Sequence, residues 1–133
     1  MKVDYINFGS RIITGQENGI RYSREYSDSG LLVSNNEWEA NSDRFVKSEH
    51  FDELGNIVES HKFSYSPNLI IERYKNKFQE YTRTITEEIK GERKYIKEIY
   101  NSKTRPANNY VMVSVRDLAN KTVALFMNGQ KLL

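Results

Sequence analysis

The longest run of regularly spaced apolar residues lies between Pro67 and Lys103. Apolar side chains recur there mostly three or four positions apart, and charged residues fill most of the positions between them. That spacing places one apolar stripe along a helix. Ser66 suits the N-cap position and Pro67 suits the first helical turn. The pattern therefore predicts one long helix over about residues 67–103.

Gly91 is the expected break in this helix, because glycine inside a helix costs about 1 kcal/mol relative to alanine. An unbroken helix would be about 55 Å long, whereas a compact domain of this size has a diameter of about 36 Å. Two arrangements reconcile these lengths. Either the helix folds back at Gly91, or residues 95–100 overhang the sheet and are buried against a second subunit. The second alternative predicts a homodimer.

Short stretches of alternating or wholly apolar residues flank the predicted helix. Residues 20–26 and 110–115 alternate with the period of a half-buried strand, and residues 122–127 are nearly all apolar. Asn128-Gly129 favours a type I′ turn. The sequence predicts an α+β fold with an antiparallel sheet of short strands, one long helix and a C-terminal hairpin. We expect a single domain with a strand-rich acidic half (1–66), the basic helix (67–103) and the C-terminal strands (107–133).

Residues 44–65 predict a hairpin around a two-residue loop, Gly55-Asn56, in which glycine comes first as a type II′ turn requires. That register sets Glu49 opposite Lys62 and His50 opposite His61. It also places four metal-binding side-chain types on one face: His50, Asp52, Glu59 and His61. A solvated hairpin tip explains the same residues, and a slip of one residue would separate the histidines. We therefore predict neither a metal site nor a cofactor.

The chain of 133 residues contains no cysteine. Of its residues, 38% are hydrophobic and 29% are charged. It is long enough for one core without disulfides. The start lacks the basic and then apolar run of a signal peptide. The apolar run 123–127 is far shorter than the roughly 20 residues that span a bilayer. We expect a cytoplasmic protein with no membrane partner.

Charge divides the chain in two. Residues 1–67 carry 7 Lys and Arg against 11 Asp and Glu, and residues 68–133 carry 13 against 7. The halves either neutralise each other, or the basic half binds a polyanion. Tyrosines among the distal bases would suit nucleic acid, and arginines such as Arg83 would suit an anionic small ligand such as a nucleotide. The candidates on the predicted helix and after it are Arg83, Arg93, Lys94, Tyr95, Lys97, Tyr100 and Arg105.

No catalytic motif is present: there is no GxSxG elbow, HExxH pair or phosphate-binding loop. No internal repeat is apparent. The preferred hypothesis is a non-enzymatic binding protein, homo-oligomeric, that engages a protein partner. An acidic surface around Trp38 would mimic nucleic-acid charge and inhibit a nucleic-acid-handling enzyme, as small proteins of phages and other mobile elements do.

Three alternatives stay open beside it: binding of an anionic small ligand, direct binding of nucleic acid, and a metal-dependent hydrolase or nuclease that uses His50 and His61. Trp38 itself suits either a core position or a contact surface. The many Asn, Lys, Ile and Tyr residues indicate an AT-rich genome, such as that of a low-GC bacterium or its phage.

Overall fold

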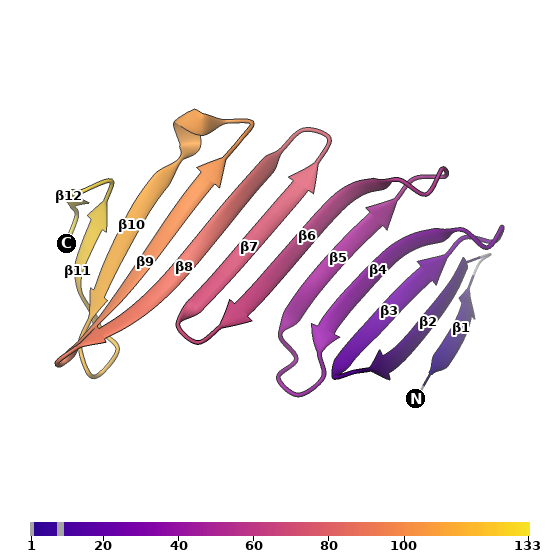
Figure 1. Cartoon of the computed structure of the whole chain (residues 1–133), viewed down its shortest axis with the longest axis horizontal. Coiled ribbons are helices and arrows are strands. Elements are labelled where there is room, and N and C mark those ends of the chain that lie inside the picture. The colour runs from indigo at the N-terminus through magenta and orange to yellow at the C-terminus, as the bar shows by residue number, and fades with distance from the viewer. Residues whose placement is uncertain (1, 8–9) are drawn as a thin grey trace. The chain divides into compact units, whose positions relative to one another are not determined.

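The computed structural model describes residues 2–7 and 10–133 and shows an antiparallel β protein (Figure 1). Among these residues the only helical element is one 3-10 turn, so the predicted α+β fold with a long helix is wrong. No helix in the described part of the chain is long and apolar enough to cross a bilayer. The elements are β1 (Val3–Asn7), β2 (Ser10–Glu17), β3 (Ile20–Tyr26), β4 (Leu32–Glu39), β5 (Phe45–Phe51), β6 (Ile57–Ser66), β7 (Leu69–Asn76), β8 (Glu80–Lys90), β9 (Arg93–Ser102), η1 (Pro106–Asn108), β10 (Tyr110–Arg116), β11 (Thr122–Met127) and β12 (Gln130–Lys131).

The chain divides into two compact units. Unit 1 contains residues 1–63 and 74–77, and unit 2 contains residues 64–73 and 78–133. Within each unit the strands lie in the order in which they follow one another along the chain. The single domain predicted from the length of the chain stays a prediction.

The predicted helix is replaced by strands β7, β8 and β9 and their turns. Pro67 and Asn68 form a tight turn in which Asn68 has φ 62°, so Ser66 caps no helix. Gly91 has φ 59° and lies in the turn at which Lys90 pairs with Arg93. It reverses a hairpin instead of bending a helix, because glycine adopts positive φ at little cost.

Side-chain chemistry explains why this segment is extended. In β8, Thr82, Thr84 and Thr86 alternate with Arg83 and Ile85. Threonine and isoleucine branch at Cβ, which favours strands over helices. Both faces of the hairpin carry charged residues, so a simple alternation of apolar and polar positions is absent. The three-to-four spacing that indicates a helix arises here from isoleucines and aromatic residues that lie on different strands.

One turn recurs three times, over residues 27–31, 52–56 and 117–121. In each, the first amide donates to the fifth carbonyl and the fourth amide donates to the first carbonyl. The fourth residue, Gly30, Gly55 or Asn120, has positive φ, as a type I turn followed by a bulge requires. The structure thus has a regularity that the residue pattern does not reveal.

The turn at residues 52–56 corrects the register of the hairpin between β5 and β6. Its loop is longer than the predicted Gly55-Asn56, so Glu49 faces Ser60 and His50 faces Glu59. The type I′ turn at Asn128-Gly129 is confirmed, since both residues have positive φ and Met127 pairs with Gln130.

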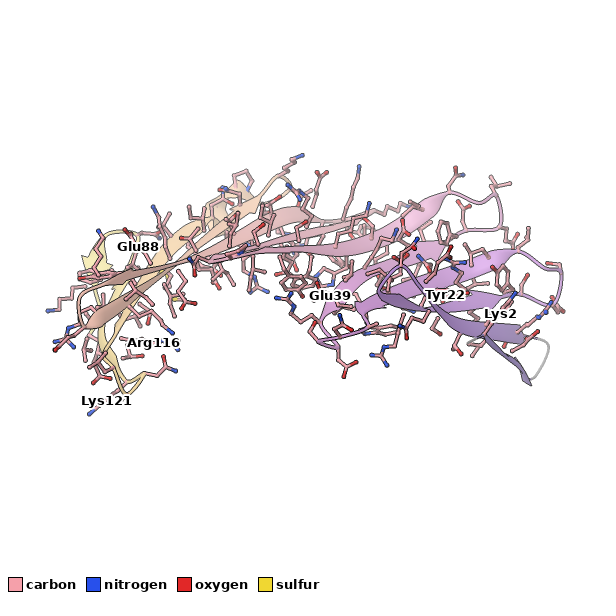
Figure 2. All side chains as sticks on the ribbon, turned by 60° about the horizontal axis from the view of Figure 1, so that its bottom comes forward. Lys2, Tyr22, Glu39, Glu88, Arg116 and Lys121 are labelled. Atoms are coloured by element: carbon pink, nitrogen blue, oxygen red, sulfur yellow. The ribbon has the colours of Figure 1, made fainter. Side chains whose placement is uncertain are left out.

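Neither unit has a second layer over its sheet in the described part of the chain. Figure 2 shows side chains projecting from both faces of the sheets. Among the described residues Val115 is the only buried hydrophobic residue, at 8% exposure. The other buried residues are polar: Ser34, Asn35, Glu49, Glu72, Ser102 and Ser114. Stability therefore rests on strand pairing, half-buried apolar side chains and polar networks.

Candidate functional site

One face of the sheet in unit 1 carries a cluster of rings, and we call it the aromatic face. The rings of Trp38 and Phe45 lie 6.4 Å apart between centroids, and those of Phe45 and Phe63 lie 5.6 Å apart. His61 lies 4.9 Å from Phe63 and 5.4 Å from Tyr74. All five residues are half-buried. Aromatic pairs at these distances attract one another beyond the effect of area burial.

A bulge in β5 brings Phe45 into this cluster. Glu37 pairs with Lys47, but Trp38 pairs with Phe45, so Val46 is the extra residue. An extra residue reverses the faces of the residues beyond it. The bulge therefore turns Phe45, and not Val46, toward Trp38.

An open hollow of about 500 Å³ lies beside Trp38. Thr14, Gln16, Arg21 and Ser23 contribute to its lining, which gives hydrogen-bonding groups next to the indole. Arg21 forms an ion pair with Asp43, and both side chains are largely exposed. The hollow therefore joins an aromatic wall to a polar rim.

Acidic side chains lie farther along the strands on the same face. Strand pairing aligns Glu25, Ser34, His50 and Glu59 in one row across β3 to β6. The hydroxyl of Tyr74 donates to Oε2 of Glu59 at 2.6 Å, and Nε2 of His50 lies 3.7 Å from Oε1. The bond to Glu59 and the burial of the phenol raise the pKa of Tyr74. The row carries two carboxylates, those of Glu25 and Glu59.

The four residues with metal-binding side chains, His50, Asp52, Glu59 and His61, do not surround one common site. His61 lies among aromatic rings. Asp52 accepts hydrogen bonds from the amides of Leu54 and Asn56, which lower the pKa of its carboxyl group. Among the described residues no group of three or more potential ligands lies close enough to hold a metal ion.

The opposite face of unit 1, the ionic face, has its own charge network. Nδ2 of Asn35 donates to Glu37 at 2.7 Å and to Glu49 at 3.3 Å. Lys47 lies 3.4 Å from Glu37 and 3.3 Å from Glu49. Arg24 donates to Asn35 and stacks on a tyrosine ring of the same strand. Two cations thus match two carboxylates, and the ionic face is neutral over this network.

The predicted basic surface of the helix does not exist, because its residues alternate on β9. Lys94 and Tyr100 project to one side, while Arg93, Tyr95 and Lys97 project to the other. Arg105 is the residue before the 3-10 turn η1. Arg83, on β8, binds Glu72 with Nη2 2.5 Å from Oε1. These candidates are therefore not brought together as one basic site.

Tyrosines form a second ring cluster, in unit 2. Tyr100 lies 5.1 Å from Tyr81 and is stacked on Tyr110 at 5.3 Å. Tyr81 donates to Oε2 of Glu72 at 3.0 Å, and Tyr110 donates to Glu98. The hydroxyls of Tyr81 and Tyr110 and the guanidinium of Arg83 are thus bound to carboxylates within the unit. We therefore interpret this cluster as part of the structure of the unit and not as a binding site.

Sequence reasoning selected Trp38 but did not join it with Phe45, Phe63 and Tyr74 in one cluster. Alternation of Phe63 with Lys62 and Ser64 indicated that it shares a face with His61. The contribution of Phe45 depends on the bulge, which no turn residue marks. Tyr74 was assigned to the helical stripe.

Comparison with known proteins identifies no relative. No family model, no curated protein and no solved structure matches this chain. Only the geometry and chemistry of its own residues therefore bear on its function.

Proposed function

We propose that this chain is a non-enzymatic binding protein that engages a protein partner through the aromatic face of unit 1. The observation that carries the proposal is the contacting row of Trp38, Phe45 and Phe63 on a face that no other described element of unit 1 covers. Aromatic residues are the commonest anchors of protein interfaces, because each buries a large area with few rotatable bonds.

The difference between the two faces supports the choice of surface. On the ionic face, Lys47 and Arg24 together match the charges of Glu37 and Glu49 within the unit. On the aromatic face the rings are half-exposed, and covering them would remove apolar area from water at a gain of about 25 cal/mol per Å². A partner therefore gains more from the aromatic face.

Trp38 makes this proposal directly testable, because it is the only tryptophan of the sequence. Tagged wild-type protein and the variant Phe45→Ala, Phe63→Ala are used to capture partners from a lysate of the source cells. We expect a protein that the wild type retains and the double variant loses. When this partner is purified and added back, the fluorescence of Trp38 should shift to shorter wavelength and become protected from iodide quenching.

Tyr22→Ala is the matched control, because it removes a ring from the ionic face. It should retain the partner, and circular dichroism should show that every variant is folded. Light scattering of the pure protein tests a second copy of the chain as the occupant. Retention of the same partner by the Phe45, Phe63 variant, or an unchanged Trp38 spectrum in the complex, would refute the proposal.

A further inference from the structure

The ring row on the aromatic face has the spacing of successive helical turns. Trp38, Phe45 and Phe63 lie on neighbouring strands β4, β5 and β6, with centroid separations of 6.4 and 5.6 Å. One turn of an α-helix rises about 5.4 Å. A helix that lies across the strands would therefore place side chains at i, i+4 and i+7 over successive rings.

The acidic row runs parallel to the ring row at a distance that matches the width of a helix. Phe63 and Glu59 are four residues apart on β6, and an extended strand rises about 3.3 Å per residue, so the rows lie about 13 Å apart. A helix with its side chains is about 10–12 Å wide. A helix lying between the rows would touch the rings with one side and the carboxylates with the other.

Charge on this face determines which sign of charge a bound helix should carry. Its described acidic side chains are Glu25, Asp43 and Glu59, and its described cation, Arg21, is already paired with Asp43. No ion pair to Glu25 is found among the residues that the structure describes. Basic side chains would thus meet carboxylates along one flank, while acidic side chains would be repelled.

We propose that the aromatic face binds a basic amphipathic helix of the protein partner. The apolar side of the helix covers Trp38, Phe45 and Phe63, and its Lys or Arg side chains reach Glu25 and Glu59. Between the rows, Asn36, Ser48 and His61 lie under the helix. This inference rests on the proposed function and specifies the chemistry of the partner segment.

The test uses three synthetic peptides of about 18 residues, which form about five helical turns. The first has leucines on one helical side and arginines beside them, the second has glutamate in place of arginine, and the third is a scrambled form of the first. Binding is followed by the fluorescence of Trp38 at low and high salt. We expect binding of the first peptide, weakened by salt, and no binding of the second.

Variants separate the two parts of the inference. Glu25→Gln with Glu59→Gln should weaken binding of the basic peptide about fivefold, the effect of two exposed ion pairs, and should reduce its salt dependence. Glu17→Gln is the control and should change neither, because Glu17 is exposed and lies on the ionic face, at the other end of the β2–β3 hairpin. Equal binding of the basic and acidic peptides would refute the charge assignment, and equal binding of the scrambled peptide would refute the helix.

Phe45→Ala tests the contribution of the rings. It should weaken binding of the basic peptide more than Glu25→Gln with Glu59→Gln does. If the basic amphipathic peptide fails to bind but the captured partner still protects Trp38, the chemistry of the segment is wrong and the proposed function stands. If neither protects Trp38, both are wrong.

Discussion

The ring of Tyr22 occupies the space in which a side chain at Gly15 would lie. The two residues pair directly across β2 and β3. A Cβ atom added to Gly15 would lie 2.5 Å from Cζ of Tyr22, closer than real Cβ contacts come. The guanidinium of Arg24 lies 4.2 Å from the centroid of the same ring, so the tyrosine is held between the glycine and the arginine. A side chain at position 15 would therefore displace this ring, and no positive φ favours glycine at this position.

Gly15→Ala should therefore lower the free energy of unfolding by about 1–2 kcal/mol, because overpacking forces the ring away from its site and weakens its cation–π contact. In a Tyr22→Ala background the same substitution should be neutral or slightly stabilising. Urea unfolding of the four proteins gives the coupling energy. An equal cost in both backgrounds would mean that the ring is not the cause.

Glu72 is the most deeply buried charged residue described, at 3% exposure. Its Oε1 accepts from Nε of Arg83 at 2.6 Å, and its Oε2 accepts from Tyr81 at 3.0 Å. Glu72→Gln removes the charge but keeps a similar shape, and it should cost about 1–3 kcal/mol of stability, because hydrogen bonds to a charged group are lost.

Glu88→Gln is the comparison for this experiment. Glu88 lies 3.7 Å from Lys90, and both side chains are about two-thirds exposed. Its loss should change stability by less than about 0.5 kcal/mol. Chemical denaturation measures both variants, and equal losses would contradict the importance assigned to the buried carboxylate.

Tyr81 gives the unit a dependence on alkaline pH. Burial and the hydrogen bond to Glu72 raise the pKa of its phenol from 10.0 to about 12. Because the folded pKa exceeds the unfolded value, this contribution to stability is complete below pH 10 and is lost as the pH rises through about 12. Tyr81→Phe should reduce the alkaline loss of stability, measured by urea unfolding at a series of pH values.

Ultraviolet titration of the phenols provides an independent check. The last phenolate to form in the folded protein should disappear in Tyr81→Phe and should form at lower pH in Glu72→Gln. A late phenolate that persists in Tyr81→Phe would assign the raised pKa to another tyrosine.

Local residue patterns predicted some strands and turns well. The alternation of residues 20–26 gives β3 with the same bounds, and residues 122–127 form β11. Asn128-Gly129 reverses the chain as predicted, because asparagine and glycine both tolerate positive φ. These are features that a few neighbouring residues determine by themselves.

The fold class was not predictable from spacing alone. A sheet buried on one face shows a period of two, whereas β8 places Arg83 on one face and Glu88 on the other, and both faces meet solvent. The signal that favoured strands was composition, namely the three threonines and Ile85 within residues 82–86. On the candidate surface, Trp38 was recognisable by type, but its pairing with Phe45 depends on a bulge.

The register of the β5–β6 hairpin can be measured by disulfide formation, because the chain has no cysteine of its own. Lys47 and Lys62 are directly opposite one another, and opposite residues in an antiparallel pair have Cα atoms about 4.5–5.5 Å apart, within the range that a disulfide spans. Lys47→Cys with Lys62→Cys should oxidise readily to an intramolecular disulfide.

Glu49→Cys with Lys62→Cys is the matched control pair. A loop of only Gly55-Asn56 would place residues 49 and 62 opposite one another, but here Glu49 faces Ser60. It should oxidise much more slowly, which thiol titration and the electrophoretic mobility of the oxidised monomer will show. Faster oxidation of the second pair would mean that Asp52 does not begin the loop, and it would shift His50 and Glu59 out of the alignment that forms the acidic row.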